Sequence, residues 1–220
     1  MYWNLIKSIT DKFLNLIYNQ KCLICGCAKV DNLLCKSCLK DVQYLNSFTQ
    51  RVYKNIPIYC ATNYKSTTKK LIQLLKFSHK KNAAIPLGQI LYNYSQRLDL
   101  KDDYIITFPA SFCLKTLNRG YNHTYLIAKE FSKHTNFEIK KDIIQKTKYT
   151  KPQYKAKNRH KNIKDSFKIN EKYIEYLKDK NILIIDDITT SGATLEELIN
   201  CFLNVEIKNI TYLVISKAGC

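Results

Sequence analysis

Residues 181–195 read Asn-Ile-Leu-Ile-Ile-Asp-Asp-Ile-Thr-Thr-Ser-Gly-Ala-Thr-Leu. An apolar run of strand length ends at two consecutive acids, Asp186 and Asp187, and a hydroxyl-rich turn around Gly192 follows. Apolar residues then recur at helical spacing, which predicts a helix that begins near Thr194. A strand, a tight turn and a helix in this order are typical of α/β proteins.

This strand–turn–helix segment has the features of a phosphate-binding site. Amide groups and the positive end of the helix dipole face the turn, hydroxyl groups add donors, and Gly192 lets the backbone approach a ligand closely. Paired carboxylates at the end of a strand are suited to accept hydrogen bonds from sugar hydroxyls. The alternative is a helix that is merely capped by Thr and Ser, but capping does not require two acids after an apolar strand.

The rest of the chain alternates between short apolar strands and amphipathic helices. Expected strands cover residues 58–62, 104–108, 181–185 and 210–215, and expected helices cover residues 67–78, 83–97, 121–134 and 194–204. This alternation predicts a mostly parallel sheet flanked by helices, with ligands at the carboxyl ends of the strands. The 220 residues are expected to divide into a helix over 1–20, a small module over 21–50 and a main α/β domain over 51–220.

The small module contains two C-x-x-C pairs. The first is Cys22 and Cys25, and the second is Cys35 and Cys38. Two such pairs let four thiolates converge on one Zn²⁺ in a closed, structural site, whose binding energy would fold a segment too short for its own core. Buried free thiols or a redox pair are the alternatives, and Cys27 competes with Cys25 as a ligand. The remaining thiols are expected to be core or surface residues: Cys60, Cys113, Cys201 and Cys220.

The nine Cys residues also bear on the compartment. An odd number does not suit a secreted disulfide framework. The first twenty residues are apolar but are interrupted by Lys7, Asp11 and Lys12, so they resemble neither a signal peptide nor a membrane span. The protein is therefore expected to be cytoplasmic, with reduced thiols.

The chain is strongly basic, with 36 Lys and Arg against 18 acids and a formal net charge of +18. Such a charge points to a polyanionic partner, although a Lys-rich surface also serves solubility alone. Residues 145–168 carry eight Lys and Arg159 against Asp165 alone, and are expected to form a mobile basic loop rather than a core element. Together with 26 aromatic residues, this charge favours binding of single-stranded DNA. The candidate DNA contacts are Lys151, Lys155, Lys157, Lys161 and Lys164.

Residues 186–194 resemble the ribose-5-phosphate loop of the type I phosphoribosyltransferases, which bind 5-phosphoribosyl 1-diphosphate (PRPP). With a four-Cys zinc module ahead of it, such a domain is similar to the ComF family, which includes the ComFC competence proteins and GntX-like proteins. Leu75-Lys76-Phe77 resembles the family's L-K-[YF] motif, and Arg119-Gly120-Tyr121-Asn122 resembles its R-G-[FY]-N motif. A third match, P-Q…R…N…F, is formed by Pro152, Gln153, Arg159, Asn162 and Phe167.

The resemblance implies a role for each part of the site. Asp186 and Asp187 would hold the ribose hydroxyls and help place Mg²⁺, while Arg119 and Arg159 would approach the diphosphate. The 5′-phosphate would be held by Thr189, Thr190, Ser191, Gly192, Ala193 and Thr194. The diphosphate loop would consist of Phe108, Pro109, Ala110 and Ser111.

The chain departs from the family patterns at three places. The family usually has P-V-P-L-H at the diphosphate loop, and it usually has Gln where this chain has His123. Purine-salvage relatives carry a catalytic acid at the position of Thr190. This chain lacks that acid, which argues against purine ribosylation.

Two functions remain open from the sequence. The first is a competence-associated cytoplasmic protein that binds PRPP, or ribose 5-phosphate, and single-stranded DNA during natural transformation. Its further expected partner is the membrane-associated DNA-uptake machinery, which would place it at the inner face of the membrane. The alternative is an active phosphoribosyltransferase that moves ribose 5-phosphate from PRPP to an unidentified acceptor.

Overall fold

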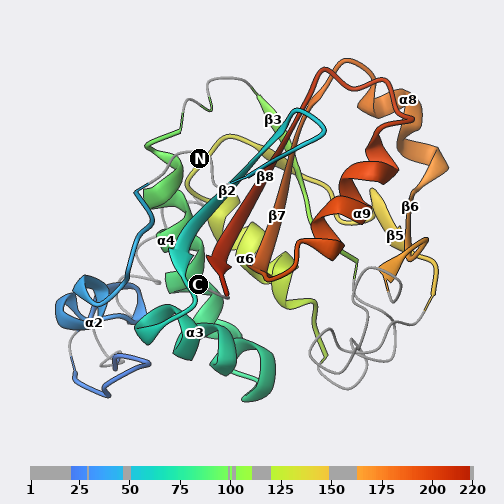
Figure 1. Ribbon diagram of the computed structural model, residues 1–220. Coiled ribbons are helices and arrows are strands. Elements are labelled where there is room, and N and C mark those ends of the chain that lie inside the picture. The colour runs from blue at the N-terminus through green and yellow to red at the C-terminus, as the bar shows by residue number, and fades with distance from the viewer. Residues whose placement is uncertain are drawn as a thin grey trace, which may run out of the picture.

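A six-stranded sheet forms the centre of the protein (Figure 1). The computed structural model describes residues 21–28, 30–46, 51–98, 100, 103–110, 120–148 and 163–218. The sheet order is β1-β2-β8-β7-β3-β4, and every neighbouring pair is parallel except β1 and β2. Its strands are β1 (Arg51–Tyr53), β2 (Ile56–Asn63), β3 (Tyr104–Thr107), β4 (Glu138–Ile139), β7 (Asn181–Thr189) and β8 (Asn209–Lys217).

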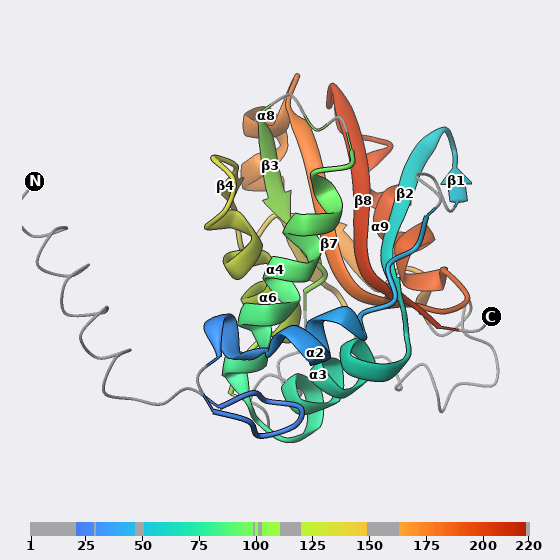
Figure 2. The same cartoon turned by 90° about the vertical axis from the view of Figure 1, so that its left-hand side faces the viewer.

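Helices cover both faces of this sheet. One face is covered by α3 (Ser66–Phe77), α4 (Ala84–Ser95) and α6 (His123–Ser132), whose apolar residues share one core cluster. Figure 2 shows α4 and α6 side by side over this face, with α3 below them at the carboxyl ends of the strands. The other face is covered by α9 (Ala193–Phe202) and by a ribbon of β5 (Ile144–Lys146) and β6 (Phe167–Ile169). Short helices complete the described chain: α2 (Lys36–Lys40), α8 (Ile174–Leu177), and the 3-10 helices η1 (Asp31–Leu33), η2 (Lys81–Ala83) and η4 (Glu171–Tyr173).

The predicted fold class is confirmed: the sheet is mostly parallel and helices flank it. All four expected strands and all four expected helices form, within a few residues of their predicted bounds. The expectation that the strand over 181–185 ends at the acids is wrong, because β7 continues to Thr189. Asp186 pairs with Val214 and Ile188 pairs with Ser216, so hydrogen bonding to β8 carries the strand past both carboxylates.

The prediction of a loop over residues 145–168 is wrong at both ends. Residues 144–146 and 167–169 pair as an antiparallel ribbon, in which Ile144 faces Ile169 and Lys146 faces Phe167. Ile163 and Phe167 are buried against α9, so apolar packing draws the flanks of this basic stretch into the core. Its centre, residues 149–162, lies outside the described residues, as does the expected helix over 1–20. Within the described part, no helix is both long and apolar enough to cross a membrane.

Candidate functional site

The alternation of side chains along β7 sends the two acids to opposite faces of the sheet. Leu183 and Ile185 belong to the core beneath α3, α4 and α6, and Asp187 continues their row. Ile182 and Ile184 belong to the core beneath α9, and Asp186 continues that row. Both carboxylates are buried.

Asp187 is held by a lysine and a histidine from distant segments. The Lys76 Nζ, at the end of α3, lies 2.5 Å from Asp187 Oδ2. The His123 Nε2, at the start of α6, lies 2.7 Å from the same oxygen. The other oxygen, Oδ1, accepts a hydrogen bond of 2.6 Å from the Ile188 amide. Three separate stretches of sequence therefore meet at one buried carboxylate.

Asp186, in contrast to Asp187, accepts its hydrogen bonds from uncharged groups. Its Oδ2 accepts a hydrogen bond of 2.9 Å from the hydroxyl of Tyr212 on β8, and its Oδ1 accepts one of 2.8 Å from the Asp187 amide. Burial raises the pKa of Asp186, and the adjacent Asp187 charge raises it further. Burial acts in the same direction on Asp187, but Lys76 and His123 outweigh it and hold the pKa of Asp187 well below its usual range. The pair is thus arranged as one ionised and one readily protonated carboxyl.

The turn after the acids has the conformation that a phosphate site requires. Gly192 has a φ of 82°, in the left-handed region that favours glycine, and α9 begins at the next residue. The Ser191 Oγ accepts a long hydrogen bond of 3.4 Å from the Ala193 amide. Thr190 is exposed, while Thr189, Ser191 and Thr194 are partly buried. The turn therefore presents hydroxyl groups at the amino end of a ten-residue helix.

The segment after Arg119 connects the remaining motifs to this site. The Tyr121 hydroxyl donates a hydrogen bond of 2.5 Å to the Leu75 carbonyl, next to Lys76. The side-chain amide nitrogen of Asn122 donates a hydrogen bond of 3.1 Å to the Pro109 carbonyl in the expected diphosphate loop, and the side-chain oxygen of Asn122 caps α6. Residues 120–123 therefore tie the L-K-F motif, the loop after β3 and the acid pair together.

The structure places some of the other predicted site residues, and the rest lie outside the part of the chain that it describes. Phe108 is buried, and Pro109 and Ala110 are partly buried after β3, on the same edge of the sheet as the turn. Lys164 is exposed beside the ribbon. The residues that lie outside the described part are Ser111, Arg119, Arg159, Lys151, Lys155, Lys157 and Lys161.

Two further residues belong to the site, although sequence reasoning did not connect them to Asp187. Lys76 lies within the L-K-F motif, and His123 is one of the departures from the family pattern. Near the site, Thr107 at the end of β3 pairs with Ile184, is fully buried, and has a hydroxyl without a hydrogen-bond partner within the described residues.

Mg²⁺ prefers oxygen ligands, which two carboxylates supply. In this structure, however, each of the four carboxylate oxygens already has a partner within the protein. A carboxylate oxygen accepts more than one contact, so these partners still leave Asp186 and Asp187 able to contact a ligand or a cation.

The four cysteines form the compact cluster that was expected. The ligand atoms of Cys22, Cys25, Cys35 and Cys38 all lie within 4.8 Å of one another, a geometry compatible with structural zinc. The Gly26 amide donates to the Cys22 carbonyl, and Gly26 has a φ of 76°, which closes the first knuckle.

The thiols of this cluster are strongly differentiated. Burial opposes ionisation of Cys22, but backbone amides, first that of Cys25, outweigh it and lower its pKa to about 6. The Cys38 amide lowers the pKa of Cys35. Hydrogen bonding to Cys25 raises the pKa of Cys27 to about 12, and burial raises the pKa of Cys38 as well. Cys27 is not one of the four cysteines whose ligand atoms cluster.

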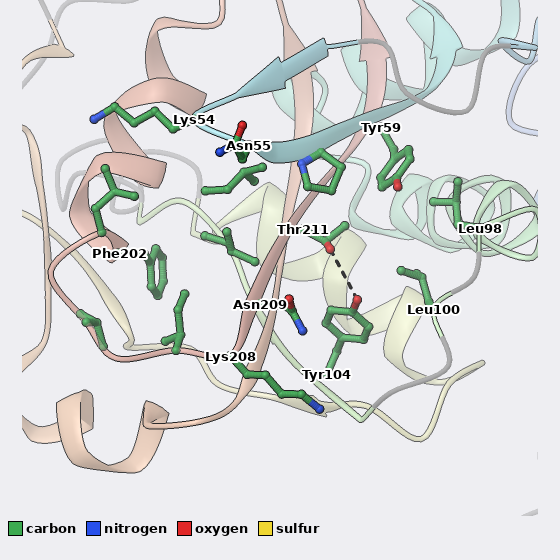
Figure 3. Close-up of a pocket in the computed structure, with 16 residues that line it drawn as sticks. Lys54, Asn55, Tyr59, Leu98, Leu100, Tyr104, Phe202, Lys208, Asn209 and Thr211 are labelled. Atoms are coloured by element: carbon green, nitrogen blue, oxygen red, sulfur yellow. Dashed lines mark hydrogen bonds between the residues drawn. The ribbon is translucent and has the colours of Figure 1, made fainter.

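A separate cavity of about 580 Å³ lies at the opposite edge of the sheet, where the strands begin (Figure 3). Its floor includes Tyr104 and Thr211, whose hydroxyls are 3.5 Å apart, and Lys54 and Lys208 lie at its rim. It contains none of the predicted site residues. The acid pair, not this cavity, is the candidate functional site.

Residues 116–220 match the phosphoribosyl transferase domain family. This part of the chain, which contains the acid pair and the turn, is therefore similar to that domain family.

Two curated relatives extend this similarity to most of the chain. Competence protein F of Haemophilus influenzae is 23% identical over 218 residues, which cover 93% of this chain and 94% of the relative. DNA utilization protein YhgH of Escherichia coli O157:H7 is 24% identical over 195 residues, which cover 83% of each chain. Among solved structures, a hypoxanthine phosphoribosyltransferase from Staphylococcus aureus is 11% identical, with a TM-score of 0.41, over 61% of this chain and 64% of that one. The domain match and the two relatives confirm the resemblance to the ComF family.

Proposed function

We propose that this chain is a competence-associated protein that binds PRPP or ribose 5-phosphate at the carboxyl end of β7. The observation that carries the proposal is the buried acid pair placed directly before a left-handed glycine turn and a helix amino end. Carboxylates accept hydrogen bonds from ribose hydroxyls, and the helix amino end attracts a phosphate. The similarity to Competence protein F supports the competence-related part of the proposal.

We assign a specific role in ligand binding to each group of the site. Asp186 and Asp187 accept hydrogen bonds from the ribose hydroxyls, and Lys76 turns from Asp187 toward an anionic oxygen of the ligand. The hydroxyls and amides of residues 189–194 hold the 5′-phosphate.

The proposed function involves two metal ions, Zn²⁺ and Mg²⁺. Zn²⁺ is held by Cys22, Cys25, Cys35 and Cys38, and it stabilises the small module. Mg²⁺ would bind mainly through the diphosphate oxygens of PRPP, and Asp186 and Asp187 would help place it, because Mg²⁺ prefers oxygen ligands. We therefore expect Mg²⁺ to strengthen the binding of PRPP but not that of ribose 5-phosphate.

Single-stranded DNA is the proposed second ligand, in the cytoplasm or at the inner face of the membrane. The formal charge of +18 supports this proposal, as does the name of the relative YhgH, a DNA utilization protein. Each Lys that contacts a single strand adds about 0.7 to the slope of log K against log salt concentration. Binding should therefore weaken steeply as salt is added.

Transfer of ribose 5-phosphate to an acceptor is the second candidate function, and the match to a transferase domain family favours it. In that reaction, the bond between the ribose C1 and the diphosphate breaks and a bond from C1 to the acceptor forms. Release of diphosphate only when a candidate acceptor is added would distinguish this activity from binding alone.

Isothermal titration calorimetry with ribose 5-phosphate and with PRPP, each with and without Mg²⁺, tests the ligand site. Asp187→Asn should abolish binding, and so should Gly192→Val, which blocks the turn without removing a buried charge. Asp103→Asn is the matched control, because Asp103 is an exposed acid at the opposite edge of the sheet. Unchanged affinity in folded Gly192→Val protein would show that the ligand binds elsewhere.

A further inference from the structure

Phe77, the last residue of α3, is the most exposed large apolar side chain in the described part of the chain, with 64% of its surface accessible. A single exposed aromatic residue is ordinary on a protein surface. Its position is unusual, however, because the preceding residue, Lys76, contacts Asp187 of the acid pair.

The chain around Phe77 is fixed to the wall of the phosphoribosyl site. The Tyr121 hydroxyl donates a hydrogen bond to the Leu75 carbonyl, two residues before Phe77. On the other side, the Lys80 amide donates to the Leu74 carbonyl, and the Lys81 Nζ lies 5.3 Å from the centre of the Tyr121 ring. These contacts hold the end of α3 in place, so the exposed Phe77 ring projects from a fixed segment. Figure 1 shows α3 at the carboxyl ends of the strands.

The charged residues of α3 and of the turn after it all have one sign. No Asp or Glu occurs between Asp41 and Asp99, so α3 and the turn after it carry only basic charges. Lys69, Lys70, Lys80 and Lys81 are all exposed. A solvent-facing aromatic ring among lysines is the arrangement that single-strand binding proteins use, with bases stacked on the ring and lysines beside the phosphates.

We propose that a base of single-stranded DNA stacks on Phe77, with Lys80 and Lys81 contacting the neighbouring phosphates. This inference rests on the proposed DNA binding and adds a base contact to it, next to the phosphoribosyl site and from residues that are not part of the basic stretch over 145–168. It also implies that a bound strand passes close to bound PRPP. A lipid surface is the competing partner, because lysines around an aromatic ring also suit anionic headgroups.

A comparison of two ligands tests the stacking contact. One is a fluorescently labelled single-stranded oligonucleotide, and the other is an abasic strand of the same length, which keeps the phosphates and lacks the bases. Phe77→Ala should weaken binding of the oligonucleotide about 5- to 150-fold, the range for loss of one stacked base. The same variant should leave binding of the abasic strand unchanged, and Phe77→Trp should restore binding of the oligonucleotide.

Two further variants separate stacking from charge and from general surface effects. Replacing Lys80 and Lys81 with Gln should flatten the salt slope by about 1.4, whereas Phe77→Ala should leave the slope unchanged. Leu203→Ala is the matched control, since Leu203 is an exposed apolar residue at the cavity on the opposite edge, and it should bind DNA normally.

The outcomes distinguish this inference from the function on which it rests. If wild-type protein binds ribose 5-phosphate but no single strand, the proposed DNA binding fails. If it binds DNA and Phe77→Ala binds equally well, only the stacking inference fails. A loss of thermal stability in Phe77→Ala that matches its loss of binding would also overturn it, because the ring would then be a structural residue. Equal dependence on Phe77 in binding to phosphatidylserine vesicles would assign the surface to lipid, and tight Phe77-dependent binding of thymidine monophosphate would assign it to a free nucleotide.

Discussion

Replacing Lys76 with Met tests whether the Asp187 contact stabilises the protein. The substitution keeps most of the apolar stem of the side chain but removes the ammonium group that lies 2.5 Å from Asp187 Oδ2. Removing one partner of a buried ion pair typically destabilises a protein by about 3 to 5 kcal/mol, because the other charge stays buried. His123 remains beside Asp187, so we expect the lower value, about 3 kcal/mol.

Urea unfolding followed by circular dichroism measures this loss. With a slope of about 2 to 3 kcal/mol per molar urea, the midpoint should fall by about 1 to 1.5 M at pH 7. Lys133→Met is the control, because Lys133 forms an exposed pair with Glu130, and it should cost less than about 1 kcal/mol.

The pH dependence of the loss follows from the pKa of Asp187. Its pKa is lowered in the folded protein, so its contribution to stability is present above the unfolded value of about 3.9 and disappears as pH falls through the folded value. Without Lys76, the folded pKa rises, and protonation at low pH relieves the buried charge. The difference between wild type and variant should therefore be smaller at pH 4 than at pH 7. Equal losses in Lys76→Met and Lys133→Met, or a loss that does not change with pH, would refute this reasoning.

Two further predictions concern the metal site and the basic stretch. Elemental analysis of the purified protein should find one zinc per chain. Replacing Cys35 and Cys38 with Ser should remove the zinc, whereas Cys27→Ser should retain it. A full zinc content in the double variant would show that these cysteines do not hold the metal. Replacing Lys151, Lys155, Lys157 and Lys161 with Gln should flatten the salt slope of single-strand binding in fluorescence anisotropy by about 3 and leave PRPP binding largely intact. Arg159→Ala should do the opposite, and a slope unchanged by the four Lys substitutions would place the DNA elsewhere.

The larger elements could be predicted from the sequence because their periodicity is local. The strands β2, β3, β7 and β8 and the helices between them show apolar patterns over several residues. The strands β1, β4, β5 and β6 contain only two or three residues each, so pairing with distant partners determines them. The burial of Phe167 illustrates this, because its contact with α9 includes a hydrogen bond from the Cys201 thiol to the Phe167 carbonyl.

The candidate site, like the fold, could be predicted from the sequence only in part. The acid pair and the turn are contiguous, so residues 186–194 were identified from sequence. The partners of Asp187 were not, because Lys76 and His123 reach it only after α3 and α6 pack on the same face of the sheet. A sequence pattern records which residues are present, but it does not record that an ammonium and an imidazole will meet one carboxylate.

The central claim is that the turn at Gly192 and the adjacent acids hold a phosphoribosyl ligand. Titration of ¹⁵N-labelled protein with ribose 5-phosphate, followed by amide chemical shifts, tests it most directly. The account predicts that the largest shifts occur at Gly192 and Ala193, and that the amide of Gly88, buried within α4, does not move. Shifts centred instead on Asn209 and Thr211, at the cavity on the opposite edge of the sheet, would contradict it.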